Sequence, residues 1–322
     1  MHANKARGVL IAFLAMIVAC SNAGGPVKDR RLQVVATVFP LYDFARAIGG
    51  EKVFVTMLIP PGTDARDFEL TEDDIEEAGK ADIFMFASFE MEQWAYKIIN
   101  AAAEKTNMVA VEAGRGAYML PALSPYGQVR SDSAPALTGK DPGGVVRYDP
   151  YIWLDFTNAQ KMMDNIAAAF INKDPKNAKL YKKNVGACKD ALAELDKKYK
   201  KQLAGCHTRS VLFAGNWAFA YQAQRYGLSY LPAYDLSADA EPAAGQMLAL
   251  IREIGKQKVR HIFYSSETVP VPVQTMAEDT GAVLLRLSNG QDVSREDIDA
   301  GIAFTDLMER NLEKLKTGLV CH

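Results

Sequence analysis

The chain has 322 residues, of which 37 are Lys or Arg and 39 are Asp or Glu, and its formal net charge is −2. This near balance excludes the broad basic face with which proteins bind nucleic acid, so no nucleic-acid partner is expected. A chain of this length exceeds what one hydrophobic core usually serves, and two domains are therefore expected.

The N-terminal segment predicts export from the cytoplasm. Two basic residues precede a short apolar run over 9–19, which ends at Cys20. About 11 apolar residues are too few to span a hydrocarbon core of ~30 Å, but this pattern is typical of a secretory signal. The small residues before Cys20 resemble the lipobox of bacterial lipoproteins, in which that cysteine is lipidated. We expect a signal peptide over 1–19, a flexible tether over 20–31, and a lipid-anchored protein in the periplasm or at the cell surface.

The first half of the mature chain alternates strands with helices. Gly49 and Gly50 end one expected helix, and Thr71 followed by Asp74 is typical of a capping box at the start of another. Four strand–helix repeats predict a parallel sheet with right-handed crossovers. Strands are expected at 32–38, 53–59, 81–86 and 108–111, and helices at 41–48, from Thr71 onward and at 91–105. The following stretch, 113–147, is rich in Gly, Pro, Ala and Ser and predicts a long surface loop.

One long helix is expected between the two halves of the chain. After a helix over 158–171, Asp174 and Pro175 begin a new one, because proline is favoured at the first helical position. The helical pattern continues to Leu203, which gives about 29 residues and a length of ~43 Å. A helix of this length predicts a connection between two lobes.

The second half repeats the alternation of the first. Strands are expected at 210–214, 228–231, 261–264 and 283–287, and helices at 217–226, 243–256, 272–280 and 295–315. The predicted fold class is α/β with two lobes, each a four-stranded parallel sheet flanked by helices. The lobes are expected at 32–173 and 205–322, joined by a linker helix at 174–204.

Three cysteines remain if Cys20 is lipidated, so at most one disulfide and one free thiol are expected. Cys188 lies in the middle of the long helix, and the end of that helix before Cys206 is ~22 Å further along its axis. A disulfide requires Cα atoms within ~7 Å. Cys321 is therefore the better partner for either of the other two, and the sequence leaves the pairing open.

Six segments of the chain carry a family resemblance. They are VVATVFPLYDFARAIGG, VTMLIPPGTDARDFELTEDDIEEAGKADIFMF, YDPYIWLDFTNAQKMMDNI, LFAGNWAFAYQAQRYGL, YSSETVPVPVQTMAEDTGAVLL and DLMERNLEKLKTGL. From about Gln33 to Leu319 the chain resembles the metal-specific solute-binding lipoproteins of ABC importers, the zinc and manganese receptors. The resemblance implies two lobes bridged by a rigid helix, and a monomeric binding protein that serves an ABC permease and its ATPase.

The resemblance also implies where a metal would bind, and each histidine of the family pattern is substituted in this chain. Arg66 follows the PPG turn at the first histidine position. Tyr151 stands at the second and Asn216 at the third. The fourth ligand of the family comes from the loop after the last strand, where Gln291 and Asp292 are the candidates.

These substitutions argue against a zinc or manganese site of high affinity. Zn²⁺ prefers thiolate, imidazole and carboxylate ligands, whereas arginine only donates hydrogen bonds and repels a cation. Neutral asparagine and tyrosine are weak ligands. The mature chain keeps three histidines, none at a position of the family pattern: His207, His261 and His322. We expect no cofactor, although the family would imply zinc or manganese.

Arg66 leaves three alternatives open. It could replace the metal by pairing across the lobes with Glu267 or Asp292. It could bind an anionic or polar ligand, or it could be solvated at the mouth of the cleft. An anionic ligand would receive further hydrogen bonds from Asn216, Tyr151 and Gln291. The expected acidic rim of the cleft comprises Asp67, Glu69, Glu267 and Asp292.

The predicted function is that of an extracytoplasmic solute-binding lipoprotein of an ABC importer, with weak or absent classical metal binding. One alternative is a surface or adhesin-type lipoprotein that kept the fold and lost its ligand, and another is a receptor for a non-metal polar or anionic solute. No Ser, Cys or Lys lies beside an evident base in the sequence, so an enzyme is not expected.

Overall fold

A computed structural model describes residues 31–103, 106–121, 148–215, 218–232, 244–257, 260–265 and 269–321. The chain divides into Met1–Arg30 and one compact unit, Arg31–His322. The predicted signal peptide, Cys20 and most of the tether lie outside the described residues, and so do Asn216 and Glu267. Within the described part, no helix is both long and apolar enough to cross a membrane.

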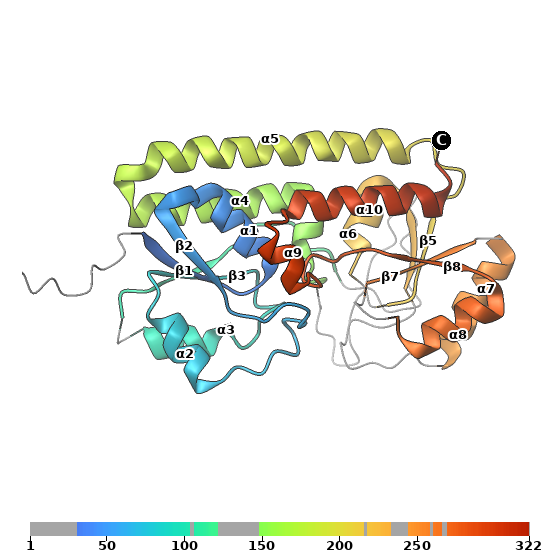
Figure 1. Cartoon of the computed structure of the whole chain (residues 1–322), viewed down its shortest axis with the longest axis horizontal. Helices are drawn as coiled ribbons and strands as arrows, with labels where there is room; N and C mark the ends of the chain where they lie inside the picture. Colours follow the sequence, from blue (N-terminus) through green and yellow to red (C-terminus); the bar gives the residue numbers. More distant parts are fainter. Residues whose placement is uncertain are drawn as a thin grey trace, which may run out of the picture. The chain divides into compact units, whose positions relative to one another are not determined.

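Two four-stranded parallel sheets form the framework, which confirms the predicted fold class (Figure 1). The first contains β1 (Leu32–Ala36), β2 (Val53–Met57), β3 (Ile83–Phe86) and β4 (Val109–Glu112) in the order β2-β1-β3-β4. The second contains β5 (Ser210–Phe213), β6 (Ser229–Pro232), β7 (His261–Tyr264) and β8 (Val283–Arg286) in the equivalent order β6-β5-β7-β8. The two lobes therefore repeat one topology.

Helices cover both faces of the first sheet (Figure 1). On one side lie α1 (Phe39–Gly49) and α4 (Phe156–Lys173), and on the other α2 (Glu72–Gly79) and α3 (Ala95–Ala102). The predicted capping box is present, because the side chains of Thr71 and Asp74 each accept the other's backbone N–H. Asp155 caps α4 by accepting two backbone N–H groups, so this helix begins two residues before its predicted start.

The helix predicted over 91–105 is shorter than expected. It begins at Ala95, because the preceding residues are turns tied to the buried carboxylate of Glu92. Glu92 accepts hydrogen bonds from the backbone N–H groups of Ala87 and Ser88 and from the hydroxyl of Thr37. The loop predicted over 113–147 is described only to Pro121 and from Tyr148, and these two residues form an isolated antiparallel bridge.

The long helix between the lobes is present. Its first turn, Pro175–Asn177, is a 3₁₀ helix (η3), and the α-helix α5 runs without a break from Ala178 to Leu203. It packs against α1 and α4 of the first lobe and against α6 (Ala220–Tyr226) and α10 (Phe304–Leu319) of the second (Figure 1). The helix thus connects the two lobes, as its length predicts.

The prediction of one closing helix over 295–315 is wrong, because the structure has two helices in this region. Ser294 caps α9 (Arg295–Asp299), and Gly301 then turns the chain with φ = 78°. The N–H of Phe304 donates to the carboxylate of Asp43 in α1 at 2.9 Å, which starts α10 afresh. The second lobe is completed by α7 (Ala244–Gln257) and α8 (Val271–Thr280).

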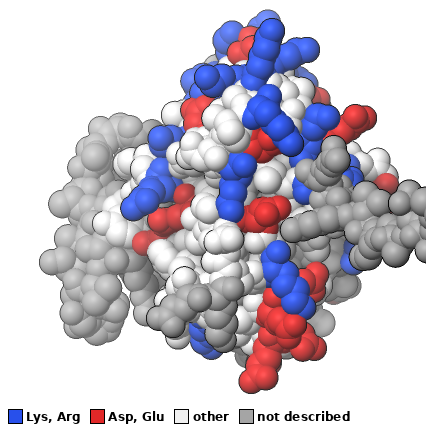
Figure 2. Space-filling model, turned by 90° about the vertical axis from the view of Figure 1, so that its left-hand side faces the viewer, with Lys and Arg blue, Asp and Glu red and all other residues white. Residues whose placement is uncertain are grey.

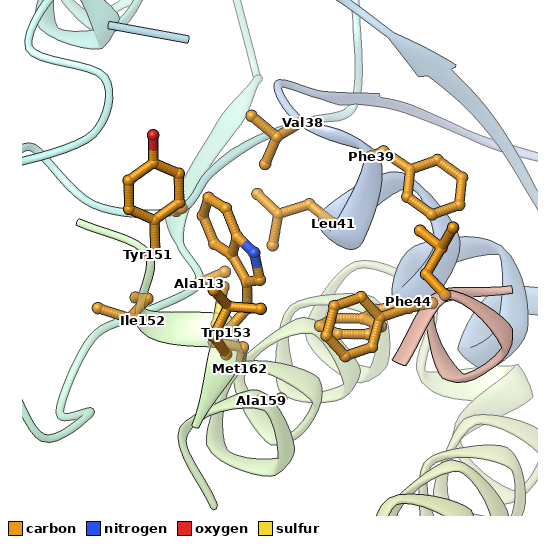
Figure 3. Packing of buried hydrophobic residues seen from close by; sticks show 14 of the residues in the cluster. Val38, Phe39, Leu41, Phe44, Ala113, Tyr151, Ile152, Trp153, Ala159 and Met162 are labelled. Carbon is orange, nitrogen blue, oxygen red and sulfur yellow. The ribbon is translucent and has the colours of Figure 1, made fainter. Parts of the chain in front are cut away.

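One buried cluster continues from the first sheet into the second lobe. Figure 3 shows part of it, where Trp153 packs among Leu41, Met162 and other apolar side chains. A smaller cluster, which includes Leu212 and Ile262, lies elsewhere in the second lobe. The lobes therefore share a core, which limits their independence.

A disulfide joins Cys206, after α5, to Cys321, after α10, while Cys188 is a free thiol. The structure thereby resolves the pairing that the sequence left open.

Candidate functional site

Arg66 lies in a turn after β2 and is held by Asp64 of the same turn. The backbone N–H of Arg66 and its Nε donate to Asp64 Oδ1 at 2.9 and 3.0 Å, and its Nη2 donates to Asp64 Oδ2 at 2.7 Å. The side chains are 13% and 24% exposed. A guanidinium and a carboxylate with two parallel hydrogen bonds form a strong and directional ion pair. The alternative of a solvated Arg66 is therefore wrong.

Tyr151 joins this pair in one polar group. Arg66 Nη2 donates to the Tyr151 hydroxyl at 2.9 Å, and that hydroxyl donates to Asp64 Oδ2 at 3.2 Å. The guanidinium carbon of Arg66 lies 5.4 Å from the centre of the Tyr151 ring, within the range of a cation–π contact. Tyr151 is fully buried, and its ring packs edge-on against Trp153. We call these three residues, Asp64, Arg66 and Tyr151, together with Gln291 and Asp149, whose contacts follow, the Arg66 cluster.

The ion pair shifts the protonation equilibria of both groups. Burial raises the pKa of Asp64, but the hydrogen bonds and charge of Arg66 outweigh burial and hold that pKa below its usual range. Burial lowers the pKa of Arg66, but Tyr151, Asp64 and Asp67 together keep it above its usual value. Both groups are therefore ionised at neutral pH, and the positive charge of Arg66 is matched within its own turn.

Gln291 reaches the same turn from the second lobe. Its Oε1 accepts the backbone N–H of Ala65 at 3.0 Å, and its Nε2 contacts Met91 Sδ at 3.7 Å. Trp94 Nε1 donates to the carbonyl of Ala65 at 2.8 Å, so both backbone groups of this residue are engaged. The cavity beside Gln291 has a volume of about 10 Å³, enough for one water molecule at most. Gln291 therefore fixes the turn that carries Arg66.

Asp149 is a member of the cluster that the sequence analysis did not identify. Its Oδ1 accepts the N–H of Tyr151 at 2.9 Å, whereas its buried Oδ2 has no hydrogen-bond partner among the residues that the structure describes. Burial raises its pKa to about 7, against the opposing effects of the Tyr151 N–H and the Arg66 charge. Asp64 was missed as well.

A local signal could have revealed both carboxylates. Asp64, Asp149 and Asn289 each accept, through Oδ1, the N–H of the residue two positions later. Those later residues are the three described positions that the family resemblance assigns to metal ligands: Arg66, Tyr151 and Gln291. Short Asp and Asn side chains favour this turn for geometric reasons.

The expected acidic rim is only partly present in the described part of the chain. Asp292 pairs with Arg286 at 3.3 Å and accepts from the Ser288 hydroxyl at 2.6 Å, so the predicted Arg66–Asp292 pair is wrong. Asp67 and Glu69 are both exposed, and the charge of Asp67 helps to raise the pKa of Arg66. Glu267 and Asn216 lie outside the described residues, and the roles predicted for them stay predictions.

The side chains of the cluster do not fit a zinc ion. Among the described residues, no group of three His, Cys, Asp or Glu side chains is placed to hold a metal. The carboxylate of Asp64 is already bonded to a guanidinium, which cannot be deprotonated and repels a cation. Of the two described histidines, His207 follows α5 and His261 begins β7, and neither belongs to the cluster.

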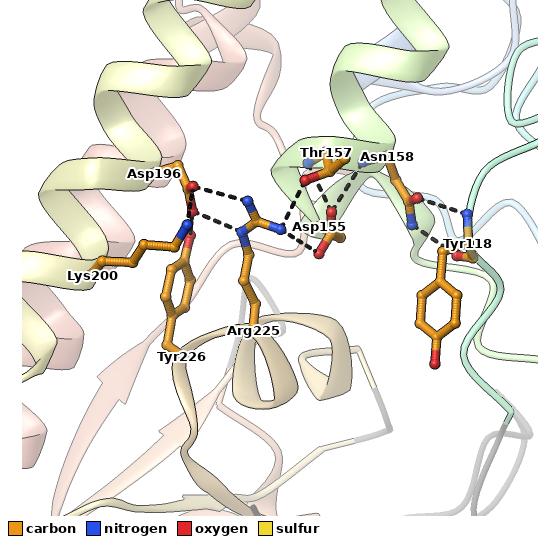
Figure 4. Close-up of polar contacts among 8 residues, drawn as sticks. All are labelled: Tyr118, Asp155, Thr157, Asn158, Asp196, Lys200, Arg225 and Tyr226. Carbon is orange, nitrogen blue, oxygen red and sulfur yellow. Dashed lines mark hydrogen bonds and ion pairs between the residues drawn. The ribbon is translucent and has the colours of Figure 1, made fainter.

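Arg225 of α6 fixes the segment that carries Tyr151. It donates to Asp155, the capping residue of α4, at 2.9 Å, and to both carboxylate oxygens of Asp196 in α5 at 2.7 and 2.9 Å (Figure 4). Trp153, between Tyr151 and Asp155, donates through Nε1 to the carbonyl of Asn289 in the second lobe at 2.8 Å. The cluster is thus supported by contacts between the lobes on more than one side.

A family model described as the periplasmic zinc-uptake complex component A, ZnuA, matches residues 34–318. The chain is 29% identical over 320 residues to the high-affinity zinc uptake system protein ZnuA of Bacillus subtilis. The alignment covers 97% of this chain and 96% of that protein. It is 25% identical over 323 residues to the metal ABC transporter substrate-binding lipoprotein FimA of Streptococcus parasanguinis, with 98% and 99% covered. It is 27% identical over 314 residues to the zinc-binding lipoprotein AdcA of Streptococcus pneumoniae, of which it spans 60%.

Solved structures resemble the fold over most of its length. The metal-dependent lipoprotein YcdH of Bacillus subtilis aligns with a TM-score of 0.74 and 29% identity, over 90% of this chain and all of that one. The Zn(II)-bound ZnuA-like domain of Streptococcus pneumoniae AdcA aligns with a TM-score of 0.73 and 26% identity, over 90% and 99%.

Proposed function

Because the chain belongs to the family of periplasmic zinc-uptake components, we propose that it is a solute-binding receptor of an ABC importer that works outside the cytoplasm. The proposal includes a lipid anchor at Cys20, an ABC permease and its ATPase as partners, a monomeric state and no catalytic activity. The names of the relatives, a zinc uptake protein and an ABC transporter substrate-binding lipoprotein, support the receptor role. They do not favour a ligand-less adhesin or a receptor for a non-metal solute.

We further propose that the Arg66 cluster stands where the metal site of the family lies. The observation that carries this step is that three sequence-distant positions meet at one turn. Arg66 donates a hydrogen bond to the Tyr151 hydroxyl, and the Gln291 side chain accepts one from the backbone N–H of Ala65, the neighbour of Arg66. Residues that correspond to the ligands of one metal are expected to converge in this way, so the convergence supports the correspondence implied by the family resemblance.

In this site the guanidinium of Arg66 takes the place of a cationic cargo. It carries the positive charge, is neutralised by Asp64 and bonds to the Tyr151 hydroxyl. A metal ion would have to displace this pair and accept ligands weaker than imidazole. We therefore propose that Zn²⁺ and Mn²⁺ bind no tighter than micromolar, a binding free energy of about −8 kcal/mol at most.

Calorimetric titration of residues 21–322 with Zn²⁺ and Mn²⁺ tests this proposal. The expected result is no binding, or a dissociation constant of about 1 µM or higher. A nanomolar one-to-one complex would contradict it and would point to an acidic site that includes the predicted rim residues. Those residues are Asp67, Glu69, Glu267 and Asp292.

A further inference from the structure

The N-terminal half of α5 presents lysines that have no acidic partner. Lys179, Lys182 and Lys183 follow the i, i+3, i+4 spacing of one helix face and are exposed. In the part of the chain that the structure describes, none of these three makes an ion pair. Lys176, just before α5, is 75% exposed, and its ion pair with Asp174 is long, at 3.9 Å. We call these four lysines the α5 lysine patch.

Four of the five remaining lysines of α5 are paired, and Lys201 is the exception in the part of the chain that the structure describes. Lys189, Lys197 and Lys198 pair with Asp164, Glu194 and Glu309 at 2.7, 2.7 and 3.1 Å, and Lys200 pairs with Asp196 at 2.7 Å. Their charge is therefore compensated within the fold. In the described part of the chain, three lysines of the patch, Lys179, Lys182 and Lys183, have no such compensation. This end of α5 is therefore a site of positive potential in a mature chain whose net charge is −4 without residues 1–19.

The patch lies close to the point where the tether joins the fold. Leu32, the first residue of β1, is paired with Val53, so the chain enters the sheet beside the exposed Lys52. The same segment contacts α5, because Asn184 Nδ2 donates to the carbonyl of Ile48 at 3.0 Å. The expected tether of about 12 residues reaches ~40 Å at most. A lipid at Cys20 would therefore keep the patch near the membrane.

Acidic residues gather on the opposite side of the first lobe. Helix α2 carries five Asp and Glu residues and no basic residue, and it covers the other face of the sheet from α1 and α4. Figure 2 shows Lys and Arg over the upper end of this face of the molecule and Asp and Glu over its lower end. The charge is thus segregated along the molecule, so a charged surface would bind one end in preference to the other.

We propose that the α5 lysine patch binds the anionic phospholipid headgroups of the membrane that carries the lipid anchor. Ammonium groups within about a Debye length of an anionic leaflet are attracted to it, whereas the acidic α2 is repelled. The contact also orients the Arg66 cluster. Arg66 and Tyr151 lie beyond the carboxyl end of the first sheet, whereas the tether joins the opposite end of β1. The patch therefore leaves the carboxyl end of the first sheet, beyond which the Arg66 cluster lies, directed away from the membrane.

Vesicle co-sedimentation tests the proposal with residues 21–322, which lack the lipidated cysteine. The probes are vesicles of phosphatidylcholine alone and vesicles with about 30% phosphatidylglycerol, at 0.05 and 0.5 M salt. The test variant carries Lys179→Gln, Lys182→Gln and Lys183→Gln. The matched control carries Lys197→Gln, Lys198→Gln and Lys201→Gln, which remove the same charge from the other end of the same helix. Thermal melting verifies that both variants fold.

We expect binding to the anionic vesicles only, with a loss at high salt. The test variant should bind at least about tenfold more weakly than the unmodified chain, and the control should change less than about twofold. Equal binding to both kinds of vesicle, or equal losses in the two variants, would overturn the proposal. Because the assay uses neither metal nor lipid anchor, its outcome is independent of whether the receptor role holds. Inorganic phosphate at millimolar concentration should not compete, and full competition would assign the patch to free phosphate instead.

Discussion

Asp64 holds Arg66 at two places, because the same carboxylate accepts the backbone N–H and the guanidinium of the residue two positions later. The pair closes within one turn, because both residues belong to the segment after β2. The side chain that stands at a metal-ligand position is thus neutralised locally and presented to Tyr151.

Arg66→Ala should destabilise the fold by about 1–3 kcal/mol. The substitution leaves the carboxylate of Asp64 and the hydroxyl of Tyr151 without their main partner, but both ionic side chains are partly exposed, so the cost is below the ~3–5 kcal/mol of a fully buried pair. Urea unfolding measures the change. Arg310→Ala is the control. The Arg310 side chain is 62% exposed, so its ion pair with Asp297 should contribute less than about 1 kcal/mol to stability. Equal changes in the two variants would contradict a special role for Arg66.

Arg66→His alone should not create a zinc site, because Tyr151 and Asn216 remain poor ligands. The triple variant with histidine at all three positions should bind Zn²⁺ at least about 100-fold tighter than the unmodified chain, a gain of about 3 kcal/mol. Asp64 is the expected fourth ligand, because its Oδ2 lies 3.2 Å from the Tyr151 hydroxyl and is freed when Arg66 is removed. Zinc titration checks this, with Asp64→Asn expected to weaken the triple variant and Asp292→Asn expected to leave it unchanged. A triple variant that does not bind zinc would mean that the backbone of the site has diverged.

The stability of the fold should be highest near pH 5. Burial raises the pKa of Asp43 to about 6 and those of Glu92 and Asp149 to about 7. The folded state binds these protons more tightly than the unfolded chain, whose carboxyl groups titrate near ~4, so stability increases as the pH falls from 8 to 5. Asp196 changes the stability with pH in the opposite direction. Burial raises its pKa, but Arg225 and Lys200 outweigh burial and lower the pKa to about 2. Its contribution is present above pH ~4 and is lost below it.

Thermal melting between pH 3 and 8 measures this profile. Asp149→Asn keeps an oxygen that accepts the Tyr151 N–H and removes the titrating group, so its curve should be flatter between pH 6 and 8. Asp73→Asn, an exposed change in α2, should leave the shape of the curve as it is. A melting temperature that falls steadily from pH 8 to pH 5 would contradict the assignment.

The disulfide between Cys206 and Cys321 should stabilise the fold by about 2–4 kcal/mol, because it closes a segment with a sequence separation of 115 residues. Cys206→Ser combined with Cys321→Ser should lower the melting temperature, and a reductant should have no further effect on that variant. Cys188→Ser is the control, since this thiol is free. In residues 21–322, thiol titration after unfolding without reductant should find one reactive group. Three reactive groups would mean that the disulfide does not form.

Local chemistry in the sequence determined most of the secondary structure. The alternation of apolar strands and amphipathic helices is a property of short segments, and so are the capping box at Thr71 and the proline before α5. The length of α5 and the repeated alternation were sufficient to predict two lobes with parallel sheets. The Asx turn that joins Asp64 to Arg66 is equally local, and it could have been predicted from the spacing of the two residues.

Tertiary structure alone decided the contacts between segments that are far apart in the sequence. Helix α10 starts at Phe304 because its N–H meets Asp43 of α1, 261 residues away. Gln291 meets Ala65 across 226 residues, and Cys321 rather than Cys188 lies beside Cys206. Periodicity and capping depend on neighbours in the chain, so they can be read from a short segment. The partner of a buried charge or a backbone N–H depends on which surfaces the packed core brings together, and that is a property of the whole fold.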